Sequence, residues 1–523
     1  MSPWAPLRRP VFRSLWIASL ASNVGTWVQN VGAAWLMTSL TPDPLQVSLV
    51  QAASNLPFFL LALPAGALAD VIDRRKLALA ALAWLVAASA ALAGLFYAGR
   101  VGPQALLALT FAIGVGSALL SPAFAAIVPE LVPREELEPA VSLNGISTNL
   151  ARAVGPALGG LIVASAGVGA TFALNALSFA GVVAVLARWR RDVPARTLPP
   201  ERLAGALRAG IRYVRHSTSL RNVLVRAAAF VLPASSVWAL LPLYARGELG
   251  LGPTGYGGLL ACFGVGAVAG GLLLPRARLA LGVERLATAS TLLFAAAHAF
   301  LGATRSPAVA CGALFAAGAA WLAMLSLLNT AAQLAIPSWV RARSLASYMI
   351  VLFGGLAAGS AIWGAIAGAV GVPRALSVAA AAILAGRLLT WRRPLYDVTE
   401  PDLSPGERWP DPAVASPFEL ERGPALVTVE YSIDPAEART FAAAMDRLRN
   451  IRLRDGAIRW GLWADTAVPG RYLESFVVQS WLEHLRQHER VTAADIEVQK
   501  VALAFHRGAD PPHVSHFLRE EVP

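Results

Sequence analysis

A short run of glycine, carboxylate and guanidinium residues lies between two long apolar stretches, at residues 66–76. Gly66 would let two helix backbones approach closely. Asp70 places a carboxylate where a neighbouring helix N-terminus or an arginine could meet it. Asp73, Arg74 and Arg75 follow, and basic residues at the end of a membrane helix mark the cytoplasmic side. Such residues could form ion pairs at the membrane edge. The alternative is a turn whose charges only set the orientation of the chain in the membrane.

Polar side chains also occur inside the apolar stretches, at helical spacing. Asn23, Trp27 and Asn30 share one helix face, and Gln51 and Asn55 share another. Amides in hydrocarbon need partners, so these faces should point into the bundle or a cavity. The sequence therefore predicts a substrate cavity lined by Asn23, Trp27, Asn30, Gln51, Asn55, Asn149 and Arg152. For any single amide, the alternative is a hydrogen bond that only joins two helices.

The composition is that of a helical membrane protein. Of 523 residues, 56% are hydrophobic and 15% are charged, whereas soluble domains carry about 25% charged residues. The net charge of +12 does not indicate nucleic-acid binding, because the basic residues cluster at the ends of apolar segments. Cys262 and Cys311 lie inside apolar runs, which predicts small core residues and neither a disulfide nor a metal site.

Twelve apolar runs are long enough to span a bilayer, which takes about 20 residues. They lie near 15–38, 45–69, 77–98, 103–128, 139–164, 168–187, 223–245, 254–275, 284–303, 307–333, 341–368 and 373–391. We therefore predict an all-α polytopic membrane protein with twelve transmembrane helices in two six-helix halves. The halves cover about 10–187 and 223–392, joined by a linker at 188–222. The arginine distribution predicts that both termini are cytoplasmic. We expect the chain to lie in the cytoplasmic (inner) membrane.

The linker and the C-terminal part have different compositions. Arg208, Arg212 and Arg215 fall on one helical face, which predicts either an amphipathic helix at the membrane surface or a simple connection between the halves. After the transporter part, 1–393, residues 394–422 form a proline-rich linker. Residues 423–523 predict a small cytoplasmic ferredoxin-like α+β domain. Its strands are expected at Ala425–Ile433, Ala457–Trp463 and Tyr472–Ser480, its helices at Pro435–Ile451 and Trp481–Val491, and a strand-like or mixed segment at Ile496–His506.

The charged run resembles the loop between helices 2 and 3 of the major facilitator superfamily, written G-x-L-A-D-x-x-G-R-[RK]. Asp73 stands where the general pattern has glycine. The segments 129–133, 155–160 and 241–246 resemble the branch that includes enterobactin-type siderophore exporters and macrolide efflux pumps. The resemblance covers roughly residues 10–392. It implies alternating access, with Gly66, Asp70, Asp73, Arg74 and Arg75 as a gating motif.

A second motif lies in the predicted fifth helix, where Gly155, Pro156, Gly159 and Gly160 follow one another closely. Proline removes a backbone donor and glycine allows close packing and bending, so a hinge is expected there. The resemblance places this hinge at the antiporter motif and implies export. The alternative is the ordinary enrichment of glycine and proline in membrane helices.

The coupling ion is implied only by resemblance. The resemblance implies proton antiport, yet no apolar span has a carboxylate near its middle. The arginine of the general antiporter pattern in helix 4 is also missing, with a residue near Thr110 in its place. The chain contains no G-x-x-x-x-G-K-[ST] motif, which argues against an ATP-driven pump.

The C-terminal domain resembles small antibiotic-biosynthesis-monooxygenase-like domains, which pair as dimeric α+β barrels. Residues 472–478 and 481–484 carry this resemblance, and a homodimer through the domain is therefore possible. His484 and His488, with Glu483 beside them, could hold a metal, but no third ligand is evident. We interpret them as a solvated helix face without chemistry, and expect no metal, no cofactor and no enzymatic activity.

Taken together, the sequence predicts a secondary active transporter that exports small amphipathic organic compounds, such as a drug, a macrolide-like metabolite or a siderophore. Its expected partners are this substrate, the lipid bilayer and a coupling proton, with no nucleic acid. One alternative is a transporter fused to an enzymatic or ligand-sensing tail that modifies or senses the transported compound. Another is a transporter-derived sensor that binds without transport.

Overall fold

The computed structural model describes residues 4–189, 203–395, 403–404 and 419–520, without the side chains of residues 67, 69–71, 203–209, 338 and 341–343. Most of the predicted linker 394–422, part of the linker 188–222 and the side chains of Asp70 and Arg208 lie outside the described residues. The chain divides into two compact units. The first comprises Met1–Pro200, Leu224–Asn329 and Tyr348–Leu395, and the second Glu201–Val223, Thr330–Ser347 and Tyr396–Pro523.

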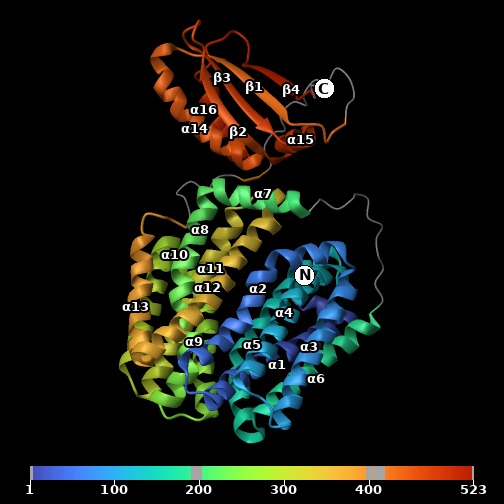
Figure 1. The fold of residues 1–523 in the computed structure, drawn as a ribbon, viewed down its shortest axis with the longest axis vertical. Coiled ribbons are helices and arrows are strands. Elements are labelled where there is room, and N and C mark those ends of the chain that lie inside the picture. Colours follow the sequence, from blue (N-terminus) through green and yellow to red (C-terminus); the bar gives the residue numbers. More distant parts are fainter. Residues whose placement is uncertain (1–3, 190–202, 396–402, 405–418, 521–523) are drawn as a thin grey trace. The chain divides into compact units, whose positions relative to one another are not determined.

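The first unit begins with six long helices, drawn in blue to green in Figure 1. They are α1 (Pro10–Leu40), α2 (Pro44–Val71), α3 (Arg74–Tyr97), α4 (Pro103–Leu131), α5 (Leu137–Ala166) and α6 (Val168–Arg188), with short turns η1 (Ala5–Arg8) and η2 (Arg134–Glu136). α1 packs on α5 and α6, α2 on α4, and α3 on α4 and α6. Prolines at the first turn of α1, α2 and α4 suit these positions because the first turn has no use for the missing N–H.

Helices α8 to α13 form the second six-helix half (Figure 1). They are α8 (Thr218–Ala234), α9 (Ser236–Leu243), α10 (Pro253–Ala303), α11 (Pro307–Leu334), α12 (Arg341–Val370) and α13 (Val372–Leu389), with the π-helical turn η3 (Tyr244–Glu248) after α9. α10 has 51 residues, far more than the ~20 that cross a bilayer. At Gly282, φ is 72° and ψ is 168°, so α10 is two spanning helices joined at this glycine.

The count of spanning helices agrees with the prediction. In the described part of the chain, ten helical segments are long and apolar enough to cross a membrane, among them α8 to η3 taken together and α10 counted once. α1, with 31 residues, is as long as most of these segments but is more polar than they are, and it is not counted among the ten. Counting α1 and the two parts of α10 gives the predicted twelve, six in each half.

The second unit contains α7 (Leu203–His216), η4 (Ser338–Val340) and the C-terminal domain. The domain consists of β1 (Ala425–Ser432), η5 (Pro435–Glu437), α14 (Ala438–Asp455), β2 (Ala457–Ala464), β3 (Arg471–Val478), α15 (Trp481–Arg490), α16 (Ala493–Leu503) and β4 (His513–Leu518). The antiparallel sheet has the order β2-β3-β1-β4, which is the predicted ferredoxin-like arrangement. Alternate residues of β1 are buried, and they pack with Phe441, Met445 and Leu448 of α14.

One element of the C-terminal domain was predicted wrongly. The segment Ile496–His506, expected to be strand-like or mixed, belongs mostly to helix α16. Thr492 starts this helix with a capping box, in which the Asp495 backbone N–H donates to the Thr492 hydroxyl and the Thr492 backbone N–H donates to the Asp495 carboxylate. The fourth strand comes later, at β4, where Leu426 pairs with Phe517.

Candidate functional site

A cavity with a volume of about 430 Å³ lies between the two halves of the first unit. Residues from α1, α2, α4 and α5 line one side, and residues from α9, α10, α11 and α12 line the other. This volume is within the range of pockets that bind small organic ligands.

Seven residues were predicted to line a substrate cavity, and five of them line the cavity described here: Trp27, Asn30, Gln51, Asn55 and Arg152. The other two are not among the described lining residues. Asn23 donates a hydrogen bond to the Ser147 hydroxyl over 3.3 Å, joining α1 to α5. Asn149 donates to the backbone carbonyl of Gly145 over 3.0 Å, within its own helix. Asn23 therefore follows the helix-joining alternative, whereas Asn149 bonds only to the backbone of its own helix.

The apolar part of the lining is aromatic. Trp27 and Trp238 lie with ring centroids 6.3 Å apart, and Trp238 and Trp321 lie 6.2 Å apart. Phe58 and Phe353 stack at 4.6 Å across the two halves. Trp27 was predicted to line a cavity because it shares a helix face with two asparagines. The phenylalanines gave no signal, because an aromatic residue in an apolar run looks the same whether it faces lipid or a cavity.

Glycines of α5 allow close contacts between helices beside the cavity. A Cβ built on Gly155 would lie 2.5 Å from the Cβ of Trp27 in α1. A Cβ on Gly160 would lie 2.6 Å from the Pro253 carbonyl oxygen and 2.9 Å from the Cα of Gly257, both in α10. Gly159 likewise packs on α1, so the predicted glycine segment is where α5 touches both halves.

The two halves also meet where α1 ends. Arg246 donates hydrogen bonds to the hydroxyls of Thr38 over 3.0 Å and Ser39 over 2.7 Å. Its guanidinium lies 5.6 Å from the ring centroid of Trp35, which stacks on Tyr256 of α10 with 5.9 Å between ring centroids. This end of the bundle is therefore closed.

Among the described residues of the first unit, the opposite end of the cavity is open. Arg152 and Thr148 of α5 line the cavity, and their helix face continues through Gly145 to Val141 toward the start of α5. A Cβ on Gly145 would meet no atom within 4 Å, and Val141 is 57% exposed. The face that lines the cavity thus reaches the surface at the end of the bundle where α5 begins.

The charged run lies at this open end, within the first half. Asp73 caps α3 by accepting a hydrogen bond from the Lys76 backbone N–H over 2.9 Å, which explains how an aspartate can replace the usual glycine. Arg74 donates to the Glu130 carboxylate at the end of α4 over 2.9 Å. Arg75 donates to the carbonyls of Leu186 and Ala187 at the end of α6 over 3.1 and 2.7 Å, where a cation also complements the helix dipole.

One prediction about this run is wrong for the present conformation. Gly66 was expected to bring two helix backbones together, but a Cβ there would meet no atom within 4 Å. The Asp70 side chain lies outside the described residues, so its predicted role stays a prediction.

The second half holds a buried charged cluster that the sequence did not single out. Arg226 of α8, whose side chain is 1% exposed, and Arg387 of α13 both pair with Glu284 of α10. A buried cation of this kind needs a partner. Glu284 therefore ties three helices of the second half together.

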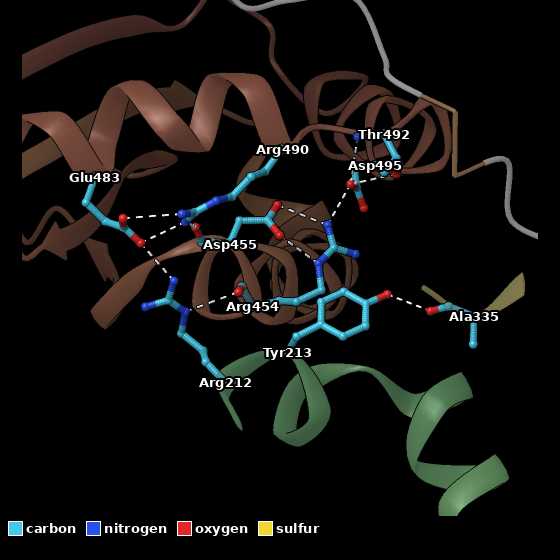
Figure 2. A network of polar contacts seen from close by, with 9 residues as sticks. All are labelled: Arg212, Tyr213, Ala335, Arg454, Asp455, Glu483, Arg490, Thr492 and Asp495. Carbon is cyan, nitrogen blue, oxygen red and sulfur yellow. Dashed lines mark hydrogen bonds and ion pairs between the residues drawn. The ribbon is translucent and has the colours of Figure 1, made fainter. Parts of the chain in front are cut away.

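A polar network joins the C-terminal domain to α7 within the second unit (Figure 2). Arg212 of α7 and Arg490 of α15 both donate to Glu483 Oε1, over 2.8 and 2.7 Å. Although burial raises the pKa of Glu483, the hydrogen bonds and charges of Arg490 and Arg212 lower it below its usual value. The carboxylate therefore stays ionised between the two guanidinium groups.

The same unit includes the connection between α11 and α12. The Tyr213 hydroxyl donates to the Ala335 carbonyl over 2.7 Å (Figure 2), and the Arg490 guanidinium lies 4.7 Å from the Trp339 ring centroid. Arg212 also donates to the Arg454 carbonyl over 3.2 Å. α7 was predicted as a membrane-surface helix or a simple connection, and these contacts show in addition that Arg212 and Tyr213, near its C-terminal end, hold the C-terminal domain and the connection between α11 and α12.

The predicted solvated face of α15 is buried instead. His484 is 1% exposed and His488 is 6% exposed, and their Nε2 atoms lie 3.3 Å apart. Burial, with the neighbouring His488, lowers the pKa of His484 to about 3, so the imidazole is neutral at physiological pH. Among the described residues, no group of three or more His, Cys, Asp or Glu side chains could hold a metal ion.

The fold and the cavity define the class of protein. Two six-helix halves around a central cavity, closed at one end and open at the other, are the architecture of a major facilitator transporter. The family profile "MFS_3: Transmembrane secretion effector" matches residues 1–523, and the chain belongs to this family. It is therefore a multi-pass membrane protein of the transporter class.

Comparison with characterised proteins gives relatives within the same class. The chain is 23% identical to the staphyloferrin A transporter of Staphylococcus aureus over 52% of this chain and 68% of that protein. It is 29% identical to the multidrug efflux pump Tap of Mycobacterium tuberculosis over 45% of this chain and 58% of the pump. It is 22% identical to the macrolide efflux protein A of Streptococcus pyogenes over 50% of this chain and 65% of that protein. The matches thus span about six tenths to two thirds of these relatives.

Solved structures support the fold. A bacterial homologue of the human lysosomal transporter Spinster superposes with a TM-score of 0.60 at 15% identity, covering 75% of this chain and 98% of that structure. A bacterial homologue of the iron transporter ferroportin gives a TM-score of 0.55 at 16% identity, covering 73% and 98%. At these identities the likeness shows the fold alone.

Proposed function

We propose that this protein exports small amphipathic organic compounds from the cell by alternating access around the central cavity. The observation that carries the proposal is the cavity itself, lined by amides and aromatic rings from both halves and closed at only one end. Rocking of the two halves would open the closed end and close the open one. Drugs, macrolide-like metabolites and siderophores all fit this class, and the names of the relatives support the same range.

The orientation follows from the basic residues at the open end. Arg74, Arg75 and Lys76 lie where α3 begins, and Arg74 pairs with Glu130 beside the start of α5. Because basic loops face the cytoplasm, the open end would be cytoplasmic, as would both termini. In this orientation the cavity would load from the cytoplasm, which suits an exporter.

The gating motif and the proton are part of the proposal. Asp70, Arg74 and Glu130 would lie at or near the cytoplasmic membrane edge, where charge and helix-dipole contacts with the second half would hold the cytoplasmic gate closed in the other state. No carboxylate is among the described residues that line the cavity. A coupling proton would therefore bind at an acidic residue outside the cavity lining, and the acidic residues of this gate are the candidates.

Accumulation of fluorescent amphipathic compounds in pump-deficient cells tests this function. Cells expressing the wild-type chain should accumulate less dye, and both Asp70→Asn and a protonophore should restore accumulation. Arg134→Gln, which also changes one charge on the predicted cytoplasmic side, should leave export unchanged. Low accumulation that persists with the protonophore would contradict proton coupling, while equal accumulation with and without the wild-type chain would contradict export.

A homodimer through the C-terminal domain is a separate proposal. One face of its sheet is covered by helices, and the other presents Trp463, which is 61% exposed, and Phe517, which is 53% exposed. Leu426 and Leu473 pair with Phe517 and Trp463 on this face. Apolar sheet faces of this kind are typical of protein interfaces.

Light scattering of the purified full chain should give the mass of a dimer, and Phe517→Lys should reduce it to that of a monomer. Val514→Lys is the matched control, because Val514 is similarly exposed, at 47%, but pairs with the buried Val429 and so lies on the opposite face. A monomeric wild-type chain, or equal effects of both substitutions, would contradict the dimer.

A sensing tail is the second candidate function for the C-terminal domain. The domain contacts α7, which connects the two halves, and the connection between α11 and α12, through Glu483, Tyr213 and Trp339. A ligand that changed these contacts could alter the transport rate. Loss of export on Glu483→Gln, with the membrane helices intact, would favour this function, and unchanged export would contradict it.

A further inference from the structure

We infer that the cavity selects an anionic amphiphile, with Arg152 as the residue that binds its negative group. The inference rests on the proposed function, because it names the substrate class of the same cavity. It concerns the charge of the substrate, which neither the family nor the relatives specify for this chain.

The first observation is the charge of the cavity. Arg152 lies on α5, and it is the one Arg, Lys, Asp or Glu among the described lining residues. No acidic side chain in the described part of the chain pairs with its guanidinium or offsets its charge. An arginine in a membrane-spanning helix without a partner is expensive, so such a residue is expected to have a function.

The second observation is an unsatisfied hydroxyl in the same cavity. Thr110 of α4 lines the cavity and is 5% exposed, and its Oγ1 makes no hydrogen bond within the described residues. A buried hydroxyl without a hydrogen-bond partner is uncommon, so its hydrogen-bond partner is expected to be a bound molecule. A carboxylate, phenolate or sulfonate held by Arg152 could present further acceptor oxygens to such donors.

The third observation is the rest of the lining. Asn30, Gln51 and Asn55 supply neutral polar groups, whereas Trp27, Trp238 and Trp321 supply aromatic surface. The lining thus combines one cation, several amides and a large apolar wall. That combination suits an organic anion with an aromatic or aliphatic body, because the guanidinium binds planar oxyanions through paired N–H donors. An organic cation would instead meet the like charge of Arg152, without a lining carboxylate to compensate it.

Two dyes of the same shape and opposite charge test the inference. Fluorescein is an anion near neutral pH, and rhodamine 123 is a cation on the same xanthene scaffold. Binding to the purified full chain is measured by fluorescence anisotropy at fixed pH. We expect wild type to prefer fluorescein, Arg152→Gln to weaken fluorescein binding about 10- to 100-fold, and Arg152→Lys to retain most of it. Arg152→Glu should prefer rhodamine 123, and this gain would also show that the variant is folded.

The outcomes separate this inference from the proposed function. Equal fluorescein binding by wild type and Arg152→Gln, or wild-type preference for rhodamine 123, would overturn the inference. If cells expressing either wild type or Arg152→Gln export rhodamine 123 equally well, export stands and the anion preference is wrong. If fluorescein binds through Arg152 but neither dye leaves the cells, the binding site stands and the export proposal fails.

Discussion

Gly160→Leu is expected to reduce export at least about tenfold, because it prevents the contact that closes one end of the cavity. A side chain at this position would collide with backbone atoms, namely the Pro253 carbonyl oxygen at 2.6 Å and the Gly257 Cα at 2.9 Å from its Cβ. Backbone atoms of a helix cannot move aside as a flexible side chain can. The two helices would separate, and the conformation that is open at the other end would lose population. The rate of dye efflux from preloaded cells measures the effect.

Gly145→Ala is the matched control on the same helix. A Cβ at Gly145 would meet no atom within 4 Å, and alanine favours helix more than glycine does. Export should therefore remain at the wild-type level. If Gly145→Ala and Gly160→Leu impair export equally, or if neither does, the contact between α5 and α10 is not what limits the transport cycle.

Arg452→Ala should unfold the C-terminal domain or bring it close to unfolding. Arg452 is 5% exposed and its Nε donates to Glu474 Oε1 over 3.1 Å, while Glu474 is fully buried. Glu474 also accepts hydrogen bonds from Trp460 over 3.0 Å and from the Tyr431 hydroxyl over 3.2 Å. Removing one partner of a buried pair leaves an uncompensated charge and costs about 3–5 kcal/mol, a large share of the ~5–15 kcal/mol that stabilises a typical domain.

Hydrogen exchange of the β1 and β3 backbone in the full-length protein measures this loss. Arg449→Ala on the same helix removes an exposed pair with Asp446 and should cost no more than about 1 kcal/mol. Similar exchange rates in the two variants would show that the Arg452–Glu474 pair does not stabilise the domain. The export rate of Arg452→Ala would show in addition whether transport requires a folded tail.

Much of the membrane fold could be predicted because its physical constraints are visible in the sequence. Each apolar run has to satisfy its own backbone hydrogen bonds, so a run of about 20 residues can only be a helix. The predicted runs near 254–275 and 284–303 correctly divided α10, although its helical hydrogen bonding continues past Gly282. Short elements were harder to predict, because tertiary contacts override weak local preferences. The segment Ile496–His506 alternates like a strand, yet the capping box at Thr492 and packing against α14 make it helical.

The candidate site was predictable only where a residue was conspicuous. Asn30, Gln51, Asn55 and Arg152 could be found because polar groups are unfavourable in a membrane helix and need a reason to be there. Phe58, Phe353 and Tyr256 could not, since aromatic residues are equally suited to lipid. The burial of His484 and His488 was also hidden, because a ten-residue helix with charged neighbours reads as exposed until the fold places it against His516 of β4.

The most direct test of the central claim is a pulsed EPR distance measurement across the open end of the cavity. Spin labels replace Gly145 of α5 and Leu272 of α10, which is 73% exposed, in a chain whose two cysteines, Cys262 and Cys311, are changed to alanine. Alternating access predicts two distance populations, of which the shorter grows with bound substrate or in Gly160→Leu. A single distance that neither substrate nor Gly160→Leu changes would contradict alternating access around this cavity.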